Sequence, residues 1–211
     1  MKKRRLASGL VLLAAFALWT VLVCAIDVQA IGPMGSSVGF AEINRFVHDL
    51  TGVHMALYTL TDWLGLVPAA IAIGFGMLGL SQWIQRKHIL KVDFSILVLG
   101  GFYLAVLAAY LFFEEFPVNY RPVLINGRLE ASYPSSTTLL TLCVMPAAWL
   151  QLKNRIQNPA LKKALARTIA VFTAFMVIAR LLSGVHWLTD IIGAILLSGG
   201  LVALYSGLIG Q

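Results

Sequence analysis

The residues best suited to chemistry in this 211-residue sequence lie at positions 180 to 190, between two long apolar runs. Arg180 is followed by His186, and Asp190 comes four positions after the histidine. Residues four apart share one face of a helix, so we expect Asp190 to hold one ring nitrogen of His186 and leave the other free as a nucleophile. Arg180 can clamp an anion in front of that nitrogen. The alternative is an ion pair that anchors two helix ends at a membrane boundary.

Two further segments carry side chains that suit a phosphate group. Residues 114–122 read Glu-Glu-Phe-Pro-Val-Asn-Tyr-Arg-Pro and contain Arg121, while residues 133–138 read Tyr-Pro-Ser-Ser-Thr-Thr. The planar donors of Arg121 and Arg180 suit phosphoryl oxygens. The hydroxyl and neighbouring backbone N–H groups of Ser135 can cap a phosphate if a helix begins there. Two arginines and a helix start are what a developing phosphoryl charge requires.

The elements that position these residues are predicted to be membrane-spanning helices. The chain is 59% hydrophobic and 12% charged, whereas soluble domains are about 25% charged. We therefore expect an all-α, polytopic membrane protein that forms a single domain over residues 1–211. The six predicted spans are residues 6–26, 63–80, 94–113, 138–152 (beginning near Ser135), 168–182 and 188–209.

The polar and apolar residues between the first two spans predict one more helix. Phe40, Ile43, Val47 and Leu50 recur at helical spacing, which indicates an amphipathic helix on the outer membrane surface. The basic N-terminus and first apolar run resemble a signal peptide. The run is long and no clear cleavage site closes it, so we expect a retained first span.

The basic residues set the expected orientation. Twelve of the 16 Lys and Arg residues lie at the N-terminus or in the connections after the second and fourth spans. Cytoplasmic loops are enriched in Lys and Arg, so both termini are predicted to be cytoplasmic and the candidate site extracytoplasmic. The net charge of +7 then reflects topology, and we expect no nucleic-acid partner. The sequence does not predict an oligomeric state.

From about residue 114 to the C-terminus, the three segments in this order resemble the type 2 phosphatidic acid phosphatase family, which shares a core with vanadium haloperoxidases. The resemblance implies a membrane lipid phosphatase. Arg121 and Arg180 match the phosphate-binding arginines, and Ser135 matches the serine of the Pro-Ser-Gly-His segment. His186 matches the nucleophile that becomes a phosphohistidine, and Asp190 its orienting carboxylate.

The sequence departs from the family pattern at three positions. Glu114 stands where the family has a lysine, and Ala179 replaces the serine before Arg180. Thr137 stands where the family histidine protonates the departing alkoxide. Losing a general acid typically costs about 10²- to 10⁴-fold in rate. Ser136, Thr137 and Glu114 are further candidates for contact with the substrate.

Three interpretations of Thr137 stay open. The substrate can be a polyprenyl diphosphate or another lipid diphosphate, whose phosphate leaving group needs no acid. Another group can supply the proton, with Glu114, Glu115 or His54 as candidates. The protein can instead be a catalytically impaired lipid-phosphate-binding protein or a phosphotransferase.

The sequence indicates neither a metal site nor a cofactor. One histidine and one carboxylate lie in the third segment, and arginines stand where a metal otherwise supplies positive charge. Cys24 and Cys143 both fall in apolar runs without ligand-spaced neighbours, so we expect two small core residues and no disulfide.

Overall fold

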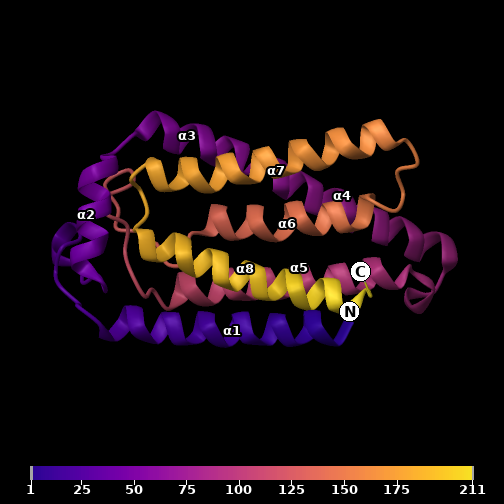
Figure 1. Cartoon of the computed structure of the whole chain (residues 1–211), viewed down its shortest axis with the longest axis horizontal. Helices are drawn as coiled ribbons and strands as arrows, with labels where there is room; N and C mark the ends of the chain where they lie inside the picture. The colour runs from indigo at the N-terminus through magenta and orange to yellow at the C-terminus, as the bar shows by residue number, and fades with distance from the viewer. Residues whose placement is uncertain (1, 211) are drawn as a thin grey trace.

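The computed structural model describes residues 2–210 and is a bundle of long α-helices joined by short connections (Figure 1). The all-α prediction is confirmed. The helices, including two short 3₁₀ turns, are α1 (Lys2–Ala25), η1 (Pro33–Gly35), α2 (Ala41–Thr51), α3 (Met55–Leu64), α4 (Leu66–Arg86), η2 (Ile89–Lys91), α5 (Phe94–Glu115), α6 (Ser136–Leu152), α7 (Pro159–Leu182) and α8 (Leu188–Leu208).

Five helical stretches are long and apolar enough to cross a membrane within the described part of the chain. They are α1, α3 with α4, α5, α7 and α8, which supports a multi-pass membrane protein. The sixth expected span, α6, has 17 residues, at the short end of what spans a hydrocarbon core. The count of six spans therefore stays a prediction.

The fifth predicted span begins too late. Helix α7 starts at Pro159 instead of residue 168, and its first turns carry Lys162, Lys163 and Arg167. The side chain of Asn158 accepts hydrogen bonds from the N–H groups of the first turn, and proline occupies the first helical position. Both features stabilise a helix start in a polar stretch that hydropathy alone excludes.

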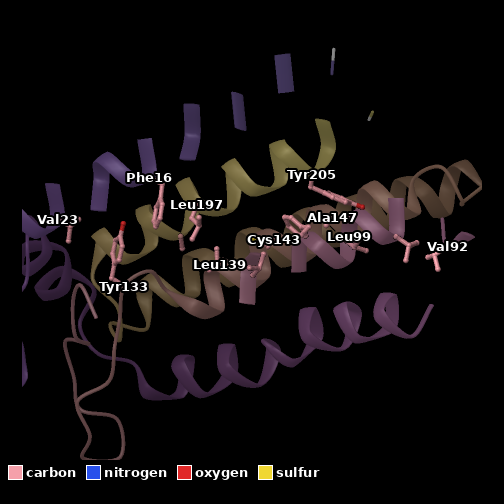
Figure 2. Close-up of a cluster of buried hydrophobic side chains, with 14 residues drawn as sticks. Phe16, Val23, Val92, Leu99, Tyr133, Leu139, Cys143, Ala147, Leu197 and Tyr205 are labelled. Carbon is pink, nitrogen blue, oxygen red and sulfur yellow. The ribbon is translucent and has the colours of Figure 1, made fainter. Parts of the chain in front are cut away.

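The core lies between α1, α5, α6 and α8 (Figure 2). Helix α6 occupies the middle of the bundle, and about half of its residues are buried. Phe16 of α1 stacks on Tyr133, with ring centroids 6.1 Å apart, and Tyr205 of α8 lies toward the other end of the cluster, near Leu99. Cys143 is buried in this core as predicted, but Cys24 is exposed on α1, because it lies on the face of that helix turned away from its neighbours.

Helices α1 and α8 approach each other closely through glycine. A Cβ atom added to Gly9 would lie 3.0 Å from the carbonyl oxygen of Gly200, and one added to Gly200 would lie 3.2 Å from that of Gly9. Close backbone contact of this kind is how helices associate where no hydrophobic effect drives them together. The N-terminal helix is therefore built into the bundle against the last one.

The two ends of the bundle differ. Both chain ends and the α6–α7 connection lie at one end, whereas α2 and the α7–α8 connection lie at the other (Figure 1). The helix predicted at residues 40–50 is confirmed as α2. Its inward side carries Asn44, which is fully buried, while Ile43 and Leu50 are exposed. Placement of α2 on the outer membrane surface stays a prediction.

Candidate active site

The third motif segment folds as the connection between α7 and α8. Arg180 lies in the last turn of α7, His186 lies in the connection, and Asp190 lies in the first turn of α8. Gly184 adopts φ +67°, and a Cβ atom there would lie 1.9 Å from the carbonyl oxygen of Gly52. Glycine is required because the α2–α3 connection passes against this turn.

The carboxylate of Asp190 is fully buried and surrounded by donors. It accepts hydrogen bonds from the Asn119 amide (3.2 Å) and the backbone N–H of Trp187 (2.9 Å). It also accepts one from the Ser132 hydroxyl. The bond from Trp187 caps the start of α8. These donors fix the position of the carboxylate.

Asp190 reaches His186 through Ser132. The carboxylate oxygen and Nδ1 are 3.7 Å apart, too far for a hydrogen bond, whereas Ser132 Oγ is 3.0 Å from Nδ1. The hydroxyl has a single hydrogen, and it is donated to Asp190. Nδ1 must therefore carry the proton of the ring. It donates this proton to the Ser132 hydroxyl oxygen and also lies 3.2 Å from the Ser132 carbonyl oxygen. Nε2 is left with the lone pair.

The free nitrogen of His186 is buried. Nε2 has no hydrogen-bond partner, and 1% of the side chain is exposed. The pKa of His186 is lowered to about 4, chiefly by burial and also by the nearby Arg121 and Arg180, while the Asp190 carboxylate opposes these effects. The imidazole is therefore neutral at pH 7, and Nε2 carries an unshared lone pair, the form in which the ring can act as a nucleophile.

A short hairpin brings Arg121 to the same place. Its tip is the Asn126-Gly127 turn, where both residues have positive φ, and its arms pair Tyr120 with Ala131. Arg121 Nε lies 3.1 Å from a carboxylate oxygen of Glu130 without alignment for a hydrogen bond, and Nη1 has no partner. The hairpin thus supplies a largely buried guanidinium that pairs with Glu130 through Nε and keeps Nη1 without a protein partner.

Arg180 is 1% exposed and is held by α3. Its Nη1 donates to Thr61 Oγ1 at 3.1 Å and to the Tyr58 carbonyl at 3.4 Å. Its Nε has no partner. Both arginines therefore keep free N–H donors, as an anion site requires.

The start of α6 lies beside this network. Ser135 is fully buried, its hydroxyl donates to Thr138 at 3.0 Å, and its N–H donates to the Asp190 carbonyl at 3.2 Å. Ser136 instead lines a polar cavity of about 270 Å³ next to Arg121 and Ser132. Of the two serines, Ser136 is the one open to this cavity.

Glu114 and Thr137 fall in two different cavities. Glu114 lines the polar cavity together with Glu130. Thr137 lines an apolar cavity of about 490 Å³ between α4, α5 and α6. The two cavities share Tyr110, Ser136 and Leu139 in their walls. A polar chamber thus adjoins an apolar groove at the start of α6.

Several residues of the site carry no signal in the sequence. Ser132 lies directly before the second motif segment and is not part of the family pattern. Tyr58 and Thr61 belong to a stretch that the sequence predicts as a connection between spans. His54 is exposed and its ring contacts the Thr51 carbonyl at 2.9 Å.

Residues 2–210 contain no group of three His, Cys, Asp or Glu side chains placed to bind a metal. The absence of a metal requirement stays a prediction.

Comparison with known proteins bears on the fold and the family of this chain. A PAP2-type phosphatidylglycerolphosphate phosphatase from Bacillus subtilis has a similar crystal structure, with a TM-score of 0.53 over 95% of this chain and 94% of that one, at 20% sequence identity. That likeness establishes a shared fold and extends across both halves of the bundle. No curated protein matches the sequence. The model of the PAP2 superfamily matches residues 101–210, which hold the hairpin, the start of α6 and the His186 connection. With more than half of its length matched, the chain belongs to the PAP2 superfamily.

Proposed function

We propose that this protein is an integral membrane lipid phosphatase or diphosphatase that acts through a phosphohistidine intermediate. The observation that carries the proposal is the state of His186. Nδ1 is fixed as a donor by Ser132, and Nε2 is a neutral, unpartnered nucleophile. Free N–H groups of Arg121 and Arg180 accompany it. This set provides a nucleophile and positive charge for a phosphoryl group.

The proposed reaction has two steps. His186 Nε2 attacks phosphorus, the N–P bond forms, and the bond from phosphorus to the leaving oxygen breaks. Asp190 and Ser132 stabilise the positive charge that develops on the ring, while the arginines neutralise the phosphoryl oxygens. Water then attacks phosphorus, the N–P bond breaks, and inorganic phosphate is released with the ring returned to its neutral form.

Thr137 favours a diphosphate substrate. A threonine hydroxyl does not supply a proton near neutral pH, and an alkoxide leaving group needs one. A phosphate leaving group does not, so a polyprenyl or other lipid diphosphate suits this site better than a monoester.

The cavities support a lipid substrate. The polar cavity beside Arg121 has room for a headgroup, and the apolar groove that adjoins it at Ser136 runs between α4, α5 and α6. A chain that lies in this groove reaches the headgroup cavity without leaving an apolar environment.

We place the site at the extracytoplasmic face. The N-terminus and the connections α4–α5 and α6–α7 carry most of the Lys and Arg residues and lie at the end opposite His186. The positive-inside rule makes that basic end cytoplasmic. Hydrolysis at the outer face suits recycling of a lipid carrier.

A second candidate is a protein that binds lipid phosphates with impaired turnover, or a phosphotransferase. The observation that favours it is again Thr137, because both candidate phosphate-binding arginines are present while the family's acid is missing.

Phosphate release from a panel of lipids separates these functions. The purified protein is incubated with a polyprenyl diphosphate and with a lipid monophosphate. We expect release from the diphosphate at least about tenfold faster, since only the monoester needs the missing acid. Thr137→His should raise the rate on the monoester selectively. Binding without release from either lipid would contradict hydrolysis and support the second candidate.

A further inference from the structure

The side chain of Arg180 is held by residues of α3, a helix outside the three motif segments. It is almost completely buried, and a buried cation needs fixed partners. Those partners come from α3, which packs along the end of α7 (Figure 1). Helix α3 lies outside residues 101–210, the part of the chain that matches the superfamily model.

Thr61 is an oriented acceptor for Arg180. Its hydroxyl is 2.9 Å from the carbonyl oxygens of Leu57 and Tyr58, which can only accept, so its single hydrogen points back along α3. The lone pairs then face Nη1 of Arg180 at 3.1 Å. Thr61 is fully buried, and its contact with the arginine is therefore shielded from water.

Tyr58 contacts both arginines of the site. The guanidinium carbon of Arg180 is 4.8 Å from the ring centroid, and that of Arg121 is 5.8 Å away. Both distances are within the range in which an aromatic ring attracts a cation. Two guanidinium groups repel each other, so a shared aromatic ring offsets part of the cost of holding both near one phosphate.

These contacts determine which donors of Arg180 stay available. Nη1 is used by Thr61 and by the Tyr58 carbonyl, whereas Nε is buried without a partner. Asp62 adds an ion pair at 3.9 Å, but its side chain is 60% exposed. Asp62 therefore contributes attraction to the buried guanidinium from its edge, whereas Tyr58 and Thr61 make the close contacts that fix its orientation.

Helix α3 is itself tied to the segment that carries His186. The N–H of His54, at the start of α3, donates to the Ser183 carbonyl at 3.0 Å. Gly184 passes directly against Gly52. The position of α3 along α7 is therefore set by the same turn that places the histidine.

We propose that Tyr58 and Thr61 are positioning residues of the phosphate site, which aim Arg180 and, through the Tyr58 ring, Arg121 at the substrate. The proposal rests on the proposed function, because it assigns these arginines to a substrate phosphate. It makes α3 a working part of the site instead of a connection between spans.

The test compares paired substitutions on α3. Tyr58→Leu removes the ring and Thr61→Val removes the acceptor, while Tyr58→Phe and Thr61→Ser keep the ring and the hydroxyl. Thr59→Val is the matched control, because Thr59 is exposed and its hydroxyl donates only to the Met55 carbonyl. KM and kcat are measured with a lipid diphosphate, and the affinity for inorganic phosphate is measured separately by calorimetry.

We expect Tyr58→Leu to raise KM and weaken phosphate binding on the order of tenfold, the effect of losing a desolvated cation–π contact. Thr61→Val should do the same by roughly tenfold or more, as for a lost hydrogen bond to a charged group. Tyr58→Phe and Thr61→Ser should restore most of each loss, which a general packing defect would not predict. If Tyr58→Leu does not fold, the Thr61→Val and Thr61→Ser pair decides.

Two results separate this proposal from the proposed function. Turnover by the wild type, with KM and phosphate affinity of folded Tyr58→Leu and Thr61→Val equal to those of Thr59→Val, would overturn the positioning role alone. Phosphate binding that is sensitive to Tyr58 and Thr61, without turnover of any lipid, would support the positioning role and overturn the phosphatase. A wild type that neither binds nor releases phosphate would overturn both.

Discussion

Residues 101–210 and residues 2–100 contribute to the site in different ways. The later region supplies every group assigned to chemistry, including His186, Asp190 and both arginines. The earlier region supplies side chains that support the later one. Asn44 donates a hydrogen bond to Thr189, which precedes Asp190, and Thr61 accepts one from Arg180. The superfamily model matches only the later region, whereas the similar fold covers both. The chemistry is thus local in sequence, but the geometry that it needs is not.

The strongest test of the later region is His186→Ala. Loss of the nucleophile should reduce phosphate release by more than about 10³-fold, because the arginines alone leave only electrostatic assistance. Release is measured with saturating lipid diphosphate in detergent micelles. His88→Ala, in the α4–α5 connection at the opposite end of the bundle, is the control. Normal turnover by His186→Ala would remove the nucleophile from the mechanism.

Ser132→Ala tests the bridge between Asp190 and His186. The ring would keep the Ser132 carbonyl as a partner for Nδ1 but lose the hydroxyl that links it to the carboxylate. We expect kcat to fall roughly tenfold to a hundredfold, the equivalent of about 1.5–3 kcal/mol for a hydrogen bond to a charged group. Ser198→Ala makes the same chemical change within α8, where the hydroxyl donates to the Ile195 carbonyl. Equal rates for the two variants would rule out the bridge.

The pH dependence of His186 protonation tests whether its ring is shielded from water, as its burial implies. Because burial lowers its pKa to about 4, the ring should stay neutral on acidification from pH 7 to 5 and take up a proton only near pH 4. The unfolded chain takes up that proton near pH 6.5, so folding stability should decrease as the pH falls from about 6.5 toward 4. NMR titration of the ring, assigned with the His186→Gln spectrum, measures the midpoint. A midpoint near 6.5 would mean that solvent reaches the ring.

Asn44→Ala tests the earlier region and should have the smallest effect on rate. The fully buried amide of Asn44 donates to the Gly39 carbonyl and to Thr189, and it accepts from the Thr189 N–H. Its loss leaves buried backbone groups without partners, at a cost of about 1–3 kcal/mol of stability. We expect a lower melting temperature with kcat changed less than about threefold, because no catalytic group loses a direct contact. Asn154→Ala, an exposed site, is the control. A large loss of kcat at unchanged stability would assign Asn44 to catalysis.

The sequence predicts the helices well where apolar residues are continuous and less well where they are not. The helices α5 and α8 agree closely with the ranges predicted for them, because hydropathy falls sharply at their ends. The start of α7 is missed because its first turns are basic, and α3 is missed because Thr59, Thr61 and Asp62 interrupt its apolar residues. Cys24 shows a further limit. An apolar run in a membrane protein does not tell which residues face other helices, since lipid is apolar too.

The site follows the same division. His186, Asp190, Arg121 and Arg180 are recognisable because their spacing is fixed by one chain segment or by a motif. Ser132 is not, because its role arises only when the hairpin folds back and sets its hydroxyl between two residues more than 50 positions away. Tyr58 and Thr61 are found only through the packing of α3 against α7. Such contacts depend on tertiary structure and leave no local pattern.

Both chain ends emerge at the end of the bundle farthest from His186 (Figure 1). Affinity tags, fluorescent proteins or tethers for surface immobilisation can therefore be attached at either terminus without obstructing the entrance to the chemistry. Gly9 packs closely against Gly200, so a fusion at the amino end needs a flexible linker that keeps a bulky domain from separating α1 from α8.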